Sequence, residues 1–284
     1  MQIGRYITFL KSEYKTDSKV LLDEIYKKEP DYRGLFMYKD LIDFEEGKKS
    51  LDLNFIKIIL NYFNKSYYDV LEFIIKKSSL IEWEFKNWYN LNDDTKSLLI
   101  CKILFNDFDY KHIEEIKLDL NLLNNPPKGT FNLIARIESI HYTKNNKVNF
   151  IFEFEKLTDL IYLKSLILES CVITSFTALI SLNILKISNV ELLKIESISL
   201  LLNLEELHIV NSNLKLASPL LNLKYLKKIK LDWKDFSVEG LGGLPSLESV
   251  EILNISIDTE RIEELNQIKY LHLVDIKSTK VLIF

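Results

Sequence analysis

Cysteine, glycine and proline are all scarce in this chain of 284 residues, which contains two, seven and five of them respectively. The two cysteines, Cys101 and Cys171, lie far apart in the sequence. Two such thiols cannot supply a disulfide framework or a cysteine-rich metal site, so we expect neither. The low glycine and proline content favours helices and stacked repeats over a sandwich of strands joined by many turns.

Long hydrophobic runs are also missing. The apolar stretches, such as residues 98–104, are short or interrupted by lysine, whereas a helix that spans a bilayer needs about 20 apolar residues. The N-terminal sequence shows no basic segment followed by a long apolar run, which predicts that there is no signal peptide. We therefore expect a cytoplasmic protein without a membrane partner.

Charge of one sign does not dominate either. The chain has 37 Lys and Arg residues against 41 Asp and Glu residues, a formal net charge of −4, and the basic residues are scattered. A protein that binds nucleic acid normally shows a basic stripe or cluster, so we expect no nucleic-acid partner. Hydrophobic residues make up 47% of the chain and charged residues 27%, a balance that excludes global disorder.

The sequence does contain one apolar phrase that is repeated six times between residues 157 and 278. In the first copy, Leu163 is followed by Leu166 and Leu168, and similar offsets recur in the later copies. The copies begin 19 to 22 residues apart, at Leu163, Leu182, Leu204, Leu226, Leu247 and Ile268. A nearly fixed period in this range marks a chain of stacked structural repeats.

The phrase resembles the L-x-x-L-x-L-x-x-N/C-x-L signature of the leucine-rich-repeat family, in its short bacterial-type form. The resemblance implies that each L-x-L stretch is a short strand and that neighbouring strands pair in parallel to line a concave sheet. We therefore predict an α+β multidomain fold, with an N-terminal all-helical domain followed by a leucine-rich-repeat solenoid. The apolar residues 280–284 are expected to cap the last repeat.

The repeats depart from the family signature at its Asn/Cys position, where only the first copy has a matching residue, Cys171. Asn or Asp stands one residue earlier in four of the copies, at Asn189, Asn211, Asn254 and Asp275. These side chains either cap the turn that leaves each strand, which we favour, or lie at the edge of the binding face.

The first 125 residues carry helix signals and are predicted to form a helical bundle domain of six to eight helices. Apolar residues recur at three- and four-residue steps over residues 53–63, and Ser66 with Asp69 resembles a capping box before the next helix. Asp93 or Asp94, and later Asp109, are expected to cap further helices. Shorter helices are expected upstream, over residues 6–14 and 20–28.

A cluster of aromatic residues, Trp83, Phe85, Trp88 and Tyr89, lies within this helical half. Tryptophan and tyrosine dominate binding hot spots, so one interpretation is an exposed anchor for a partner. The other interpretation, which we favour, is packing between neighbouring helices. Cys101 lies on an apolar helix face and is expected to be a buried, inert thiol.

Residues 126–156 form the junction between the two predicted domains. Two prolines and a glycine within residues 124–129 mark the boundary, and β-rich stretches follow at residues 131–142 and 148–154. These stretches form either a hairpin that caps the repeats or a degenerate first repeat, which we favour. The repeat domain then covers residues 157–284.

The alternation of side chains along a strand predicts which residues leave the sheet. The residue between the second and third apolar positions forms an outward column, and three of the four histidines fall in it if the degenerate first repeat supplies His141. His208 and His272 are three repeats apart, about 14 Å, which is too far to share a metal ion. The residues predicted to bind a partner are Glu169, Lys186, Glu206, His208, Lys230, Asp232, Trp233, Glu251, Tyr270 and His272.

The sequence has no glycine-rich phosphate loop, H-E-x-x-H or G-x-S-x-G motif, so we predict no catalytic residue, metal or cofactor. The family resemblance implies a non-catalytic module that binds a protein partner on the concave face, as a toxin-neutralising immunity protein or a regulatory adaptor. The alternative is an effector or enzyme whose helical domain is catalytic and whose repeats select the substrate. If the concave face binds the partner, Trp233→Ala weakens binding by about 2 kcal/mol or more.

Overall fold

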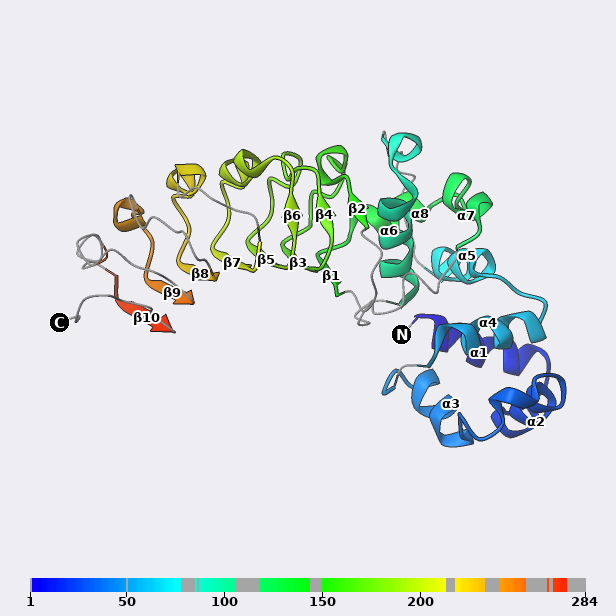
Figure 1. Ribbon diagram of the computed structural model, residues 1–284. Coiled ribbons are helices and arrows are strands. Elements are labelled where there is room, and N and C mark those ends of the chain that lie inside the picture. The colour runs from blue at the N-terminus through cyan, green and yellow to red at the C-terminus, as the bar shows by residue number, and fades with distance from the viewer. Residues whose placement is uncertain are drawn as a thin grey trace. The chain divides into compact units, whose positions relative to one another are not determined.

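The computed structural model in Figure 1 describes residues 2–49, 51–77, 85, 87–105, 118–143, 150–212, 218–232, 241–253, 265 and 268–274. The chain divides into two compact units. The helical unit comprises Met1–Phe85 and Lys96–Ile134, and the repeat unit comprises Lys86–Thr95 and Ala135–Phe284. The repeat unit therefore includes a short segment, Lys86–Thr95, from the half of the sequence predicted to be helical.

The described residues contain eight α-helices, and seven of them begin before residue 125, as the helix signals predict. They are α1 (Gln2–Glu13), α2 (Ser18–Lys28), α3 (Tyr38–Glu45), α4 (Leu53–Tyr62), α5 (Tyr67–Lys77), α6 (Asp93–Phe105), α7 (Leu120–Asn124) and α8 (Thr130–Ala135). Two 3-10 helices accompany them, η1 (Pro30–Tyr32) and η2 (Trp88–Asn90). Within the described ranges, every helix is too short or too polar to cross a bilayer.

Side-chain caps explain where two of the early helices begin. The carboxylate of Asp17 accepts hydrogen bonds from the amides of Lys19 and Val20, at 2.8 and 2.9 Å, and so starts α2. Asp69 accepts bonds from the amide and the hydroxyl of Ser66, at 2.8 and 2.7 Å, which fixes the start of α5. The capping role predicted for Ser66 and Asp69 is therefore confirmed.

The predicted cap of α6 needs a correction. The side-chain oxygen of Asn92 accepts the amide of Thr95 at 2.9 Å, so the cap is Asn92 and not Asp93 or Asp94, which lie in the first helical turn. An asparagine one residue earlier satisfies the same orphan amides as the aspartates would. The prediction of a helix capped by Asp109 falls outside the described residues and stays a prediction.

Residues 131–142, predicted to be β-rich, begin with a helix instead. Thr130–Ala135 forms α8, and only Ser139–Tyr142 is a strand. Ile134 and Ala135 of α8 are buried, and so is Ile137, which follows the helix. Gly129 leads into α8 with φ +95°, a left-handed backbone conformation that glycine adopts readily.

Two parallel sheets form the framework of the repeat unit (Figure 1). The larger has seven strands in the order β1 (Ser139–Tyr142), β3 (Ser165–Glu169), β5 (Ile184–Ser188), β7 (Glu206–Val210), β8 (Lys228–Asp232), β9 (Ser249–Leu253) and β10 (Tyr270–Val274). The smaller has the order β2 (Ile151–Phe152), β4 (Val172–Ile173) and β6 (Glu191–Leu192). The 3-10 helices η3 (Phe154–Lys156), η4 (Ile195–Leu200), η5 (Ser218–Asn222) and η6 (Leu241–Gly243) follow these strands along the chain.

The repeated apolar phrase forms the core of this unit. Leu163, Leu182, Leu204 and Leu226, which lead four consecutive copies, are fully buried. The strand register places the apolar residues of one copy beside those of the next, so each repeat completes the core of its neighbour. Ile268, which leads the last copy, is only partly buried.

The first strand of the large sheet lies where a first repeat would place it. β1 pairs in parallel with β3, with Ser139 opposite Ser165, whereas β2 belongs to the smaller sheet. The two strands of a hairpin would pair antiparallel with each other. Of the two interpretations drawn from the sequence, the degenerate first repeat fits this pairing.

A left-handed backbone residue follows each of three strands. Ser170, Asn189 and Asn211 have φ values of 56°, 52° and 48°. Asparagine tolerates this conformation better than other residues with a side chain, apart from aspartate. The left-handed backbone thus explains why Asn189 and Asn211 stand one residue before the Asn/Cys position of the repeat signature. Asn254 and Asp275 lie outside the described residues.

Candidate protein-binding surface

The outward side of the large sheet, which we name the sheet face, collects side chains from every strand. Buried and half-buried residues alternate along β3, β5, β7 and β9. Because side chains of a strand point to opposite sides in turn, the half-buried ones lie on the sheet face. Three outward positions on each five-residue strand therefore form three columns across the sheet.

The central column is the one that the repeat period predicts. Strand pairing places its members directly opposite one another, and they are His141, Ile167, Lys186, His208, Lys230, Glu251 and His272. Successive histidines in the column are three strands apart, about 14 Å. Among the described residues, no group of three or more side chains is placed to hold a metal ion.

The other predicted site residues belong to the flanking columns. Glu206 and Tyr270 lie at the starts of their strands. Glu169 and Asp232 lie at the ends of theirs, and the register aligns both positions with the same column. Trp233 lies outside the described residues, so its predicted role as an aromatic anchor stays a prediction.

Apolar side chains are interspersed with the charged ones. Five of them are half-buried on the sheet face: Ile167, Ile184, Val210, Leu253 and Val274. Protein interfaces combine apolar contacts with a polar surround in this way. The sheet face thus carries apolar contact points on five of its seven strands.

Five titratable residues of the sheet face are paired with one another. Glu206 Oε1 lies 2.8 Å from Lys186 Nζ on β5 and 2.9 Å from His208 Nε2 on β7. Lys230 Nζ lies 2.8 Å from Glu251 Oε1 on the next strand. These pairs align the long side chains across neighbouring strands and leave little net charge at the centre of the face.

The pairs shift the pKa values of the groups involved. Partial burial lowers the pKa of His208 below 6.5, helped by the positive charge of Lys186 and opposed by Glu206. Partial burial raises the pKa of Glu206, but the hydrogen bond and charge of Lys186 outweigh it, so the net shift is downward. The lowered pKa of His208 favours the uncharged ring, whose Nε2 lies 2.9 Å from Glu206 Oε1.

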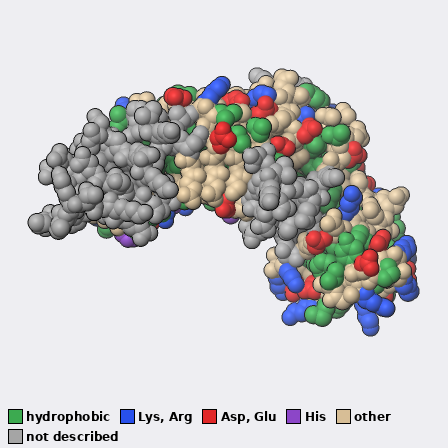
Figure 2. Space-filling view, in the orientation of Figure 1, with side chains coloured by type: hydrophobic (Ala, Val, Ile, Leu, Met, Phe, Trp, Pro, Cys, Tyr) green, Lys and Arg blue, Asp and Glu red, His purple; other side chains and the backbone are tan. Residues whose placement is uncertain are grey.

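The space-filling view supports a surface of mixed character. Figure 2 shows Lys and Arg, Asp and Glu, and hydrophobic side chains interspersed over the described part of the visible side. The described part of that side therefore shows no extended field of one sign.

The segment Lys86–Thr95 braces the first repeat, which the sequence analysis missed. The Asn92 side chain donates to the carbonyl of Ile151 at 2.8 Å, and the Ile151 amide donates to Asp94 Oδ2 at 3.0 Å. The amide of Glu153 donates to the Thr95 hydroxyl at 3.0 Å. These bonds satisfy the open edge of β2, which would otherwise expose unpaired backbone groups.

The aromatic cluster near this segment is mainly structural. Phe85 and Trp88 are buried, as the packing interpretation predicts, whereas Tyr89 is 71% exposed. Trp83 lies outside the described residues. Cys101 is fully buried in α6, and burial raises the pKa of its thiol, which keeps it protonated and unreactive.

A second set of exposed apolar side chains also escaped the sequence analysis. Ile161, Ile180 and Leu202 each lie two residues before the leading leucine of their repeat, and all three are exposed. Tyr225 is exposed just before Leu226. The common offset of Ile161, Ile180 and Leu202 within the repeat is a signal that could have found these three.

The fold is similar to that of solved structures of internalins. Internalin C2 (inlC2) from Listeria monocytogenes str. 4b F2365 aligns with a TM-score of 0.50 and 18% identity, covering 72% of this chain and 83% of that chain. An internalin (inlF) from the same strain gives a TM-score of 0.45 at 17% identity, covering 72% of this chain and 62% of that one. No protein-family model and no curated protein matches the sequence. The similarity shows a leucine-rich-repeat type of fold.

Proposed function

We propose that this protein is a binding module whose sheet face holds a protein partner. One observation carries the proposal: seven parallel strands present aligned columns of charged and apolar side chains on one continuous surface. Stacked repeats use such extended surfaces for recognition. A small ligand needs an enclosed pocket instead, so the size and openness of the face favour a protein.

The internal pairing of charges supports selective binding. Glu206 is occupied by Lys186 and His208, and Glu251 by Lys230. A partner gains affinity only if it replaces these contacts with charges of matching sign or leaves the pairs intact. A partner with like charges at these positions is rejected, because unpaired buried charges are costly.

Within this class, we infer an immunity protein that neutralises a toxin, or a regulatory adaptor, that acts in the cytoplasm. The acidic balance of the chain and the lack of catalytic motifs in the sequence support this assignment. The alternative, a catalytic helical unit, is less well supported, because its cysteine is buried with a raised thiol pKa.

Binding of a purified partner tests the proposal. The tagged protein is used to isolate a partner from host lysate, and the affinity of the purified pair is measured by isothermal titration calorimetry. Val210→Asp and Leu253→Asp each place a charge on the sheet face, and Val20→Asp places the same charge on the exposed side of α2 as a control.

The proposal expects each sheet-face variant to lose about tenfold or more in affinity, as hot-spot contacts do. The control is expected to bind as the wild type does, and circular dichroism checks that all three variants fold. Equal affinities for the three variants and the wild type would place the interface elsewhere.

A further inference from the structure

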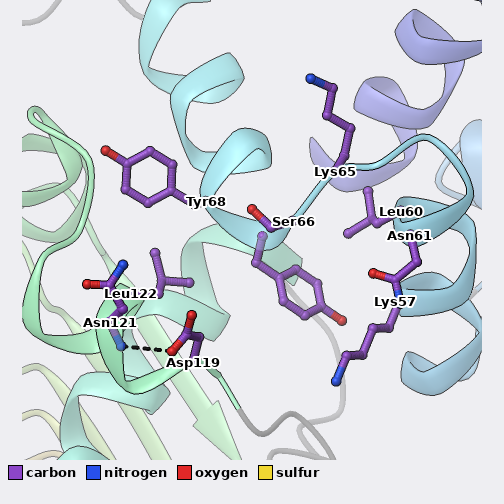
Figure 3. Close-up of a pocket in the computed structure, with 10 residues that line it drawn as sticks. Lys57, Leu60, Asn61, Lys65, Ser66, Tyr68, Asp119, Asn121 and Leu122 are labelled. Carbon is purple, nitrogen blue, oxygen red and sulfur yellow. Dashed lines mark hydrogen bonds between the residues drawn. The ribbon is translucent and has the colours of Figure 1, made fainter.

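The helical unit contains a pocket of about 420 Å³ that lies outside the sheet face (Figure 3). Its walls come from α4, from the turn that leads into α5, and from the start of α7. Figure 3 shows these three segments surrounding the space, with Asn61 and Lys57 on one wall and Asn121 and Asp119 on another. The volume falls within the range of sites for small molecules.

Hydrogen bonds within the chain fix the walls independently of any ligand. The amide of Lys65 donates to the carbonyl of Leu60 at 2.9 Å and closes the end of α4. Ser66 is bonded to Asp69 as the start of α5. On the opposite wall, the amide of Asn121 donates to Asp119 Oδ1 at 2.9 Å. Walls held in this way are preorganised for binding.

The inner surface of the pocket is apolar and aromatic. Leu60 and Leu122 line it and are almost fully buried. Tyr67 and Tyr68 line it as well, and burial raises the pKa of Tyr67, so its phenol stays uncharged. Aromatic and aliphatic walls of this type favour a flat apolar group, such as an aromatic ring.

The charges at the rim select one acidic group. Lys57 is exposed on α4 and has neither an ion-pair nor a hydrogen-bond partner in the described part of the chain. Lys65, by contrast, lies 3.6 Å from Asp69. The free ammonium group of Lys57 attracts an anion, whereas the Asp119 carboxylate on the other wall repels a second one.

We propose that this pocket binds a small molecule in which an aromatic ring carries a single acidic group, either a carboxylate or a phosphate. The ring lies between Leu60, Leu122 and the two tyrosines, and the acidic group contacts Lys57. The amides of Asn61 and Asn121 supply hydrogen bonds to polar atoms on the ring.

Calorimetry on the full-length protein with defined probes tests this proposal. Indole-3-acetate represents an aromatic carboxylate, phenyl phosphate represents an aromatic phosphate, and indole-3-acetamide is the neutral analogue. Inorganic phosphate supplies the acid without the ring. Lys57→Ala removes the proposed anion contact, Leu122→Trp fills the pocket, and Lys39→Ala removes an exposed lysine elsewhere in the helical unit as a control.

The proposal expects at least one aromatic acid to bind the wild type and the Lys39→Ala protein alike. Affinity should fall about tenfold in Lys57→Ala, and binding should be lost in Leu122→Trp. The probe that binds more tightly then identifies the acid as carboxylate or phosphate.

The proposal is overturned by no binding of either aromatic acid at millimolar concentration, by equal affinity for the acid and its amide, or by unchanged affinity in Lys57→Ala. Tighter binding of inorganic phosphate than of phenyl phosphate would also overturn it, because the ring would then contribute nothing. Since Leu122→Trp could disturb folding, the Lys57→Ala result decides the test without it.

Discussion

Lys230 on β8 and Glu251 on β9 form an ion pair across adjacent parallel strands, with 2.8 Å between Nζ and Oε1. The hydrogen bond from Lys230 lowers the pKa of Glu251 and keeps the carboxylate ionised. The two side chains remain 30% and 33% exposed, so water screens their attraction. The pair therefore arranges the sheet face and adds little to the stability of the fold.

Breaking this pair is expected to have a small effect on folding. Lys230→Met and Glu251→Gln should each lower the free energy of unfolding by less than about 1 kcal/mol, because exposed pairs are weak. Urea denaturation of the two single variants and the double variant measures the coupling. A loss of more than about 2 kcal/mol in either single variant would show that the pair is structural.

Neighbouring residues on opposite sides of β7 should differ sharply in their effect on stability. Leu207 is fully buried, so Leu207→Ala leaves a cavity and is expected to cost about 2–5 kcal/mol. His208→Ala, one residue away on the sheet face, should cost less than about 1 kcal/mol. Guanidinium denaturation compares them, and similar losses would contradict the assignment of the two sides of the strand.

The lowered pKa of His208 predicts a loss of stability in mild acid. The unfolded chain, with a histidine pKa near 6.5, takes up the proton more readily than the folded protein does. The free energy of unfolding therefore decreases as the pH falls below about 6.5. At higher pH, His208 does not destabilise the folded protein in this way. The glutamates titrate at lower pH and do not contribute in this window.

The measurement is the free energy of unfolding at about pH 7.5 and about pH 5.5, on either side of that pKa. His208→Gln should show a smaller drop between the two values than the wild type. His272→Gln, in the same column on the exposed strand β10, is the matched control. If the free energy of unfolding drops equally in the wild type and in His208→Gln, His208 does not cause the loss of stability in acid.

At Asn211, the left-handed residue after β7, substitutions should change the stability of the protein through the backbone conformation and not through side-chain contacts. Asn211 has φ 48°, a conformation that costs about 1–2 kcal/mol for an alanine. Asn211→Ala should therefore lower the melting temperature, whereas Asn211→Gly should leave it nearly unchanged. Calorimetric melting of both variants checks this, and an equally large decrease for glycine would point to a lost side-chain contact.

The sheet face could be predicted from the sequence because the same short pattern of apolar residues recurs in every repeat. Apolar positions at a constant offset specify which residues enter the core, and the register then aligns Lys186, His208 and Lys230 in one column. The ion pairs on the sheet face could not be read from the sequence in the same way. They depend on rotamers of long side chains on neighbouring strands, which the period does not constrain.

The features that the sequence analysis missed depend on contacts between distant segments. The bonds of Asn92 and Asp94 to Ile151 join residues more than fifty positions apart. Helix α8 was mistaken for a strand, because a short run of apolar and aromatic residues fits either period. The pocket in the helical unit needs α4, α5 and α7 together.

The inclusion of Lys86–Thr95 in the repeat unit has a consequence for the order of folding. These residues leave the ribosome well before Ile151 and Glu153, the residues with which they form hydrogen bonds. Domains generally fold as they emerge, but this segment belongs to the repeat unit, and its partners lie beyond residue 150. Asn92 and Thr95 must wait for the first repeat, so the N-terminal half completes its fold only when synthesis of the C-terminal half is under way.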